Sequence, residues 1–206
     1  MAITNGYATL AEIRSELGNY ASGDTTDDAK LEIAVEAASR QIDGWCGQRF
    51  YIDSDVKTRF FSAYDGVVDL SDGGFGGIAT TTGLIVATDD NTLTYGTTWA
   101  ASDYRLLPID ADDDGAPWSS LIASPVGVYT LPTYTDAVKI TAKFGWPAVP
   151  TDVKKACLIL AADLFKAKDA AFGVAGFSEM GAVRVTSGLN RLAAGLLARY
   201  RRAAVG

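Results

Sequence analysis

The chain has 206 residues, of which 48% are hydrophobic and 21% are charged, and its formal net charge is −7. This composition is ordinary for a globular protein with a sizeable core, so it excludes disorder of the whole chain. The acidic balance argues against tight wrapping of DNA, which depends on Lys and Arg neutralising phosphates. It says little about a wide pore through which DNA only passes. There an acidic wall could avoid adhesion, although a plain solvated acidic surface is the simpler interpretation.

Cysteine use and hydropathy bear on the compartment. Cys46 and Cys157 both fall on apolar faces of expected helices, which predicts buried free thiols in a reducing compartment. Residues 1–7 have neither a basic segment nor an apolar run, so we expect no signal peptide. The most apolar helical stretch, 156–165, is short and interrupted by Asp163, so no membrane span is expected.

Two helices are expected at the start of the chain. The first covers about 10–17, because Thr9 and Glu12 have capping-box spacing and Gly18 can end it. The second covers about 27–46, with Thr25 or Thr26 as its cap, and Gly47 ends it. Its apolar residues recur at helical spacing on one face. They are Leu31, Ala34, Val35, Ala38, Ile42, Trp45 and Cys46.

From residue 50 to 146 the chain is rich in Gly, Thr, Asp, Tyr and Val, which favours short strands and turns. The strand-like runs are 58–63, 67–70, 84–88, 92–95, 104–107, 127–131 and 137–144. Alternation is clearest in the last run, and it predicts a strand with one dry and one wet face. The dry set is Val138, Ile140, Ala142 and Phe144, and the wet set is Lys139, Thr141 and Lys143.

Two more helices are expected after this region. The first covers about 152–168 and is apolar around most of its circumference, which is typical of a buried helix. Residues 170–185 are punctuated by Gly and predict a loop or hairpin. The last helix covers about 189–202, with a stripe formed by Leu189, Leu192, Ala193, Leu196 and Tyr200. Arginines in its last turn suit the helix dipole.

The sequence therefore predicts an α+β fold, in which a bundle of about four helices carries a large antiparallel β insertion between helices two and three. Residues 1–50 would supply the N-terminal helices, 51–146 the insertion, and 147–206 the C-terminal helices that complete the bundle.

Catalytic chemistry finds little support. The chain has no histidine and only two cysteines, so a Ser-His-Asp or Cys-His nucleophile and a Cys-rich zinc site are both excluded. The glycines at 73, 74, 76 and 77 lack the Walker lysine and the dinucleotide spacing, and a flexible turn explains them better. We expect no enzyme activity and no cofactor, although counting carboxylates alone leaves paired-acid hydrolysis open.

One acidic motif comes closer to a metal site. Asp110, Asp112, Asp114 and Gly115 match the start of an EF-hand calcium loop, but the twelfth position is Leu121 where a bidentate Glu is needed. An acidic turn is the simpler explanation. The basic residues are dispersed, and aromatics do not interleave with them as a nucleic-acid stacking platform requires.

Three blocks of sequence resemble the head–tail connector (adaptor, head-completion) proteins of long-tailed bacteriophages. The first is a short helix leading into a long one that ends in a Cys-Gly-x-Arg-Phe segment, over 7–18 and 27–51. The second is a strand ending in Gly-Trp, then Pro-x-x-Pro and a helix, over 144–170. The third is "FGVAGFSEMGAVRV" at 172–185. These blocks bracket the β region, where "GAPW" is the one familiar phrase. The residues that carry the first two are Ala37, Ala38, Ser39, Ile42, Asp43, Cys46, Gly47, Arg49, Phe50, Gly145, Trp146, Pro147, Val149, Pro150, Val153, Lys154 and Ala156.

The resemblance implies a virion structural protein at the head–tail interface, made in the host cytoplasm. It implies a ring of copies of this chain, usually a dodecamer, beneath the portal protein. Such a ring would extend the channel for double-stranded DNA, without sequence-specific binding and without a membrane, and would dock the next neck, stopper or tail protein.

Ring closure requires two unlike faces on each subunit. The apolar third helix and a small-residue face of the second helix, with Ile33, Ala37 and Gly44, are candidates. We expect the last helix to bind the portal through Leu192, Leu196, Arg199, Tyr200, Arg201 and Arg202. The alternative, in which this helix packs on its own subunit, stays open.

Two other functions stay open as well. One is a neck stopper or tail-completion protein, for which the Gly-rich loop at 73–77 is the only candidate plug. The other is a calcium-dependent binding module or hydrolase that uses the turn from Asp110 to Asp114.

Overall fold

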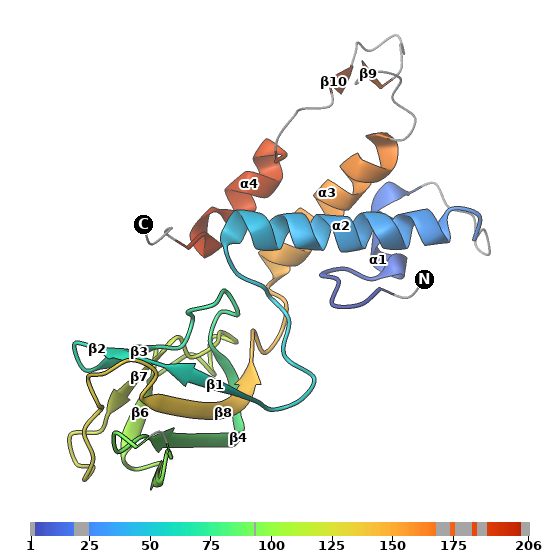
Figure 1. The fold of residues 1–206 in the computed structure, drawn as a ribbon. Coiled ribbons are helices and arrows are strands. Elements are labelled where there is room, and N and C mark those ends of the chain that lie inside the picture. The colour runs from blue at the N-terminus through green and yellow to red at the C-terminus, as the bar shows by residue number, and fades with distance from the viewer. Residues whose placement is uncertain are drawn as a thin grey trace. The chain divides into compact units, whose positions relative to one another are not determined.

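The computed structural model describes residues 3–18, 25–92, 94–167, 174–175, 183–184 and 189–202 (Figure 1). The chain forms two compact units. The helical unit is built from Met1–Gly47 and Val149–Gly206, and the β unit from Gln48–Ala148. The β unit is thus inserted between the second and third helices, which confirms the predicted α+β fold.

The described residues of the helical unit form four α-helices: α1 (Leu10–Leu17), α2 (Asp28–Cys46), α3 (Thr151–Ala167) and α4 (Arg191–Leu197), which a 3₁₀ turn, η1 (Ala198–Tyr200), continues. The α3 helix packs against α1, α2 and α4 (Figure 1). Among the described residues no helix has the length and apolar character of a membrane span. Between α3 and α4 in the sequence, residues 174–175 and 183–184 pair as the short antiparallel strands β9 (Val174–Ala175) and β10 (Val183–Arg184). The rest of the expected loop or hairpin at 170–185 lies outside the described residues.

The helix ends follow their local sequence with one exception. The Glu12 N–H donates to Thr9 Oγ1 (3.2 Å) and the Thr9 N–H donates to Glu12 Oε2 (2.7 Å), which confirms the capping box. Gly18 and Gly47 end α1 and α2 with φ of +70° and +66°. The predicted cap of α2 at Thr25 or Thr26 is wrong. The N-cap is Asp27, whose carbonyl accepts the Leu31 N–H at 2.9 Å without a side-chain cap bond.

The core of the helical unit contains the buried hydroxyl of Ser39. Ser39 Oγ donates to the Val35 carbonyl (2.7 Å), accepts the Tyr7 N–H (3.0 Å) and lies 3.5 Å from Cys157 Sγ. Both cysteines are free and buried, as predicted. Trp45, which the sequence places on the apolar face of α2, is 38% exposed, and Leu164 on the apolar helix α3 is 41% exposed.

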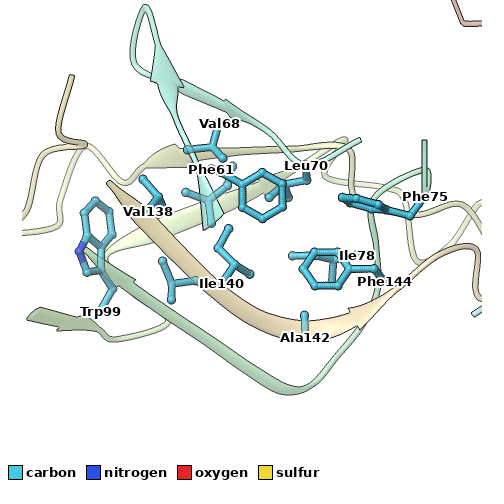
Figure 2. Packing of buried hydrophobic residues seen from close by; sticks show 12 residues of the cluster. Phe61, Val68, Leu70, Phe75, Ile78, Trp99, Val138, Ile140, Ala142 and Phe144 are labelled. Carbon is cyan, nitrogen blue, oxygen red and sulfur yellow. The ribbon is translucent and has the colours of Figure 1, made fainter. Parts of the chain in front are cut away.

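The β unit consists of two antiparallel sheets with the orders β1-β8-β4-β5 and β2-β3-β7-β6. Their strands are β1 (Lys57–Phe61), β2 (Ala63–Tyr64), β3 (Val67–Asp69), β4 (Ile78–Thr88), β5 (Thr97–Trp99), β6 (Tyr104–Leu107), β7 (Ser120–Ala123) and β8 (Val138–Phe144). A cluster of 12 buried apolar residues from both sheets forms the core, with the rings of Phe61, Phe75 and Phe144 in mutual contact (Figure 2). Side chains along β8 alternate between buried and half-buried, as its sequence predicts.

Two predicted strands are wrong. Around 92–95, the Asp89 carboxylate accepts the N–H groups of Thr92 and Thr94, both at 3.2 Å. These backbone N–H groups are therefore not available for hydrogen bonds to a neighbouring strand. At 127–131, the Gly127 N–H donates to the Ser124 carbonyl and closes a turn. The prediction also missed β5, β7 and the first half of β4.

Candidate assembly interface

The acidic residues in the described part of the chain form no metal centre. No group of three or more His, Cys, Asp or Glu among the described residues is placed to hold a metal ion. The turn from Asp110 to Asp114 is closed by backbone bonds, since the Asp114 N–H donates to the Asp110 carbonyl (3.0 Å) and the Gly115 N–H to the Asp112 carbonyl (3.2 Å). Its carboxylates are exposed and do not converge.

The Gly-rich loop at 73–77 is a turn, as expected, but it is packed. Phe75 lies in the core of the β unit, and Gly76 and Gly77 are buried. A Cβ at Gly77 would come within 2.8 Å of the Trp118 carbonyl carbon. This loop therefore does not project from the β unit.

One face of α4 packs on its own unit. Ala193, Leu197 and Tyr200 are buried, and Asn190 caps the helix because its Oδ1 accepts the Leu192 N–H at 2.9 Å. Leu197 was absent from the predicted stripe, whereas Leu192, which was in it, is 71% exposed. The actual stripe is therefore rotated from the predicted one.

The basic residues near the C-terminal end also contact their own unit. Arg199 Nη2 lies 2.8 Å from Asp152 Oδ2 at the start of α3, although the arginine side chain remains 68% exposed. The Arg201 guanidinium lies over the ring of Trp45 at the end of α2, and the Arg202 N–H donates to a neighbouring α2 carbonyl. The first two contacts hold the side chains of Arg199 and Arg201 against their own unit, and the third holds the backbone at Arg202.

The six residues expected to bind a portal thus fall into three groups. Tyr200 is buried, Arg199 and Arg201 are held by side-chain contacts within the unit and Arg202 by a backbone bond, and the exposed Leu192 is followed one turn later by the half-buried Leu196. Between these two leucines Gly195 faces open space, since a Cβ added there would meet no atom within 4 Å. The result is an apolar ridge, formed by these two leucines, that a partner can approach closely.

A second exposed face lies on α2. Ile33 is 55% exposed, and Ala37 and Gly44 are exposed on the same side of the helix. Beside Ile33 and Ala37 is a groove of about 370 Å³ whose other wall is the segment before α1. Its lining residues are Ile3, Thr4, Glu32, Ile33, Glu36, Ala37 and Arg40. The α2 face was visible in the sequence, but the groove was not, because no pattern assigns residues 3–6 to an element.

The β unit contains a buried ionic cluster that sequence reasoning missed. Asp53 is 3% exposed, and its carboxylate lies 2.7 Å from Arg49, 3.0 Å from Lys57 and 3.9 Å from Arg59. Burial would raise the pKa of Asp53, but hydrogen bonds from Lys57 and Arg49 and the charges of both outweigh it and lower the pKa. The cluster ties the segment before β1 to the sheet, which is a structural role.

The outer side of the sheet β1-β8-β4-β5 is only partly covered, by Tyr95, whose ring centroid lies 5.1 Å from that of Phe60. Phe60 on β1 and Ile85 on β4 are each 51% exposed, and Lys139, Thr141 and Lys143 of β8 lie between them. We call these five residues the open sheet face.

Solved structures share this fold over the full chain. They include chains of the neck of an empty gene transfer agent (GTA) particle computed with C6 symmetry (20% identity, TM-score 0.54) and of the neck of a native GTA particle computed with C12 symmetry (23%, 0.52). A chain in the virion of the native GTA particle is similar (22%, 0.54). Each comparison covers 100% of this chain and 96% of the other. No protein-family model and no curated protein matches the sequence. At these identities the likeness establishes a common fold.

Proposed function

We propose that this chain is a structural subunit of the neck of a phage-like particle. More specifically, it is a head–tail connector (adaptor) that forms a ring beneath the portal and acts as a non-enzymatic component of the virion. The observation that supports this most is the fold likeness, over the whole chain, to chains of GTA necks described with C6 and C12 symmetry. Independent support comes from the connector-like blocks of sequence on both sides of the β unit.

The exposed apolar surfaces suit such an assembly. A ring needs two unlike surfaces on each subunit, because contacts between unlike surfaces repeat around an axis until they close. The α2 face with its groove is one surface available for a neighbouring copy. The ridge of Leu192 and Leu196 on α4 is a separate surface, which we assign to the portal, with Arg199 at its edge for acidic portal groups. The net charge of −7 is compatible with a channel through which DNA slides without adhering.

The alternatives are less well supported. A stopper needs a loop that can reach into a lumen, and the candidate loop at 73–77 is packed into the β unit. A calcium module or a hydrolase needs converging ligands or carboxylates, and the described residues of the turn from Asp110 to Asp114 do not converge.

Quantitative mass spectrometry of purified DNA-filled particles tests the proposal by counting this chain against the portal protein. A connector ring predicts a copy number close to that of the portal. Absence of the chain from particles would overturn the proposal, and a much smaller copy number would favour a tail-completion protein.

A further inference from the structure

We propose that the turn at residues 109–114 of one copy docks on the open sheet face of the next copy, so that the β units form a second, head-to-tail contact within the assembly. This inference rests on the proposed function, because it adds a contact to a ring. It is carried by two surfaces of the β unit that complement each other in charge and in hydrophobicity.

The open sheet face is basic and partly apolar. Its four strands contain no Asp or Glu, so nothing on them neutralises Lys139 and Lys143. Among the described residues neither lysine forms an ion pair, and the Lys139 amine lies only over the ring of Tyr95, 5.2 Å from its centroid. Phe60 and Ile85 flank the lysines with about half of each side chain exposed. These two side chains add an apolar component to a basic surface.

The turn at 109–114 has the opposite character. Its carboxylates, at 110, 112, 113 and 114, are all exposed, and none forms a side-chain hydrogen bond or ion pair within the described part of the chain. Ile109 beside them is 69% exposed. Most of the apolar surface of this isoleucine is therefore available to a partner, next to four exposed carboxylates.

The turn is also preformed. Ala111 is 1% exposed, its N–H donates to the Pro108 carbonyl (3.3 Å), and its own carbonyl accepts the Ala116 N–H (2.8 Å). These bonds anchor the middle of the turn and leave the isoleucine and the carboxylates outside. A rigid turn loses little conformational entropy when it binds.

The two surfaces therefore match each other as unlike partners. Ile109 would pack on Phe60 and Ile85, and the carboxylates would meet Lys139 and Lys143. Apolar burial would supply the affinity, while the ion pairs at the rim would mainly set orientation and the rate of association. Since the surfaces belong to different sheets, the contact is heterologous and can repeat around a ring.

Disulfide trapping tests the contact directly. One batch of the full chain carries Ile109→Cys, a second, isotopically labelled batch carries Ile85→Cys, and the two are mixed in a glutathione buffer. The native cysteines are buried and can stay. The matched control replaces the second batch with Val126→Cys, since Val126 lies in the same unit and is 83% exposed. We expect several-fold more mixed disulfide from the first pair than from the control pair.

Charge exchange provides the second readout. Lys139→Glu with Lys143→Glu on the Ile85→Cys chain should reduce trapping to the control level. Asp112→Lys with Asp113→Lys on the Ile109→Cys chain should restore it. Equal trapping by the test and control pairs would overturn the contact. If the double Glu variant also lost retention of double-stranded DNA, the face would instead be a contact to DNA phosphates.

The outcomes separate this inference from the proposed function. Failed trapping together with a portal-matched copy number in particles would leave the connector standing, with a ring closed through the helical unit alone. Successful trapping of a chain that is absent from particles would show self-association in some other assembly.

Discussion

The guanidinium carbon of Arg201 lies 5.2 Å from the centroid of the Trp45 ring, so the end of the last helical turn is held against the end of α2. The next residue continues the attachment, because the Arg202 N–H donates to the Cys46 carbonyl at 3.0 Å. This pair explains why a tryptophan that interrupts the buried stripe of α2 is only partly exposed. It also means that Arg201 has a structural task before it meets any partner.

Replacing Arg201 with Ala should lower the free energy of unfolding by about 0.5–1 kcal/mol, the usual contribution of a cation–π contact at a partly exposed site. Chemical denaturation followed by tryptophan fluorescence would measure it. Arg191→Ala is the control, since Arg191 is exposed at the start of α4. An equal loss in both variants would mean that the stacking contributes nothing specific.

The outer and inner leucines of α4 should separate docking from folding. Leu192→Asp changes a side chain that is 71% exposed, so we expect an unchanged melting temperature but lost binding to the portal in a pull-down assay. Leu197→Ala empties a buried site and should cost about 2–4 kcal/mol of stability. If Leu192→Asp bound the portal as well as the unchanged chain does, the assignment of this ridge to the portal would fail.

Sequence reasoning succeeded where one local signal decides the structure. Thr9 and Glu12 define the start of α1, and the strict alternation along β8 defines a strand with one buried side. It failed where the structure is decided by a polar side-chain contact or by a contact between residues far apart in the sequence. Asp89 captures two N–H groups and prevents a strand at 92–95, and the cluster around Asp53 joins residues whose spacing carries no recognisable motif.

The candidate interface was predictable only in part for a similar reason. Helical periodicity assigns Leu192 and Leu196 to one stripe, but it does not say which side of a short helix faces its own unit. Contacts to Asp152 and Trp45, which lie in other helices, decide where the arginines point. The acidic turn and the wet face of β8 were visible in the sequence, but the strand order was needed to show that Phe60 and Ile85 flank that face.

The two cysteines should be unreactive in the folded protein. Burial raises the pKa of the Cys46 thiol to about 11, with a contribution from Asp43, and burial likewise raises the pKa of Cys157. At pH 8 only about a thousandth of Cys46 would be thiolate, the form that reacts. With Ellman's reagent we expect no prompt reaction in buffer and two thiols per chain in denaturant. Prompt release of one equivalent from the native protein would contradict the burial of these residues.

Two glycines should respond to alanine in opposite ways. Gly145 has a φ of +123°, and a Cβ there would lie 2.8 Å from Ile52 Cα and still closer to the preceding carbonyl. Gly145→Ala should therefore cost at least about 2 kcal/mol of stability. Gly44 lies in the last turn of α2 with open space around it, so Gly44→Ala should add about 0.5–1 kcal/mol. Thermal melts of both variants measure these changes in stability. An unchanged stability of Gly145→Ala would mean that this close approach of two backbones is not maintained.

The cluster around Asp53 should make the β unit sensitive to acid. Because hydrogen bonds from Lys57 and Arg49 lower the pKa of the folded carboxylate despite its burial, the ionised form is favoured in the native state. A group whose pKa is lowered by folding contributes its stability fully above the pKa of the unfolded chain, and this contribution is lost as the pH falls through the lower, folded value.

Replacing Asp53 with Asn keeps the shape but removes the charge, and it should cost about 2 kcal/mol at pH 7, the scale of one hydrogen bond to a charged group. The difference from the unchanged chain should shrink as the pH falls below the ordinary range of an aspartate, because the unfolded chain then binds a proton at Asp53 and the native carboxylate follows only at its lower pKa. Urea denaturation from pH 7 to pH 3 measures both effects.

Asp55→Asn is the matched control, since Asp55 is exposed and its carboxylate accepts a bond only from the neighbouring Ser54 hydroxyl. A difference for Asp53→Asn that stayed constant with pH would mean that packing, and not the charge of Asp53, carries the stability.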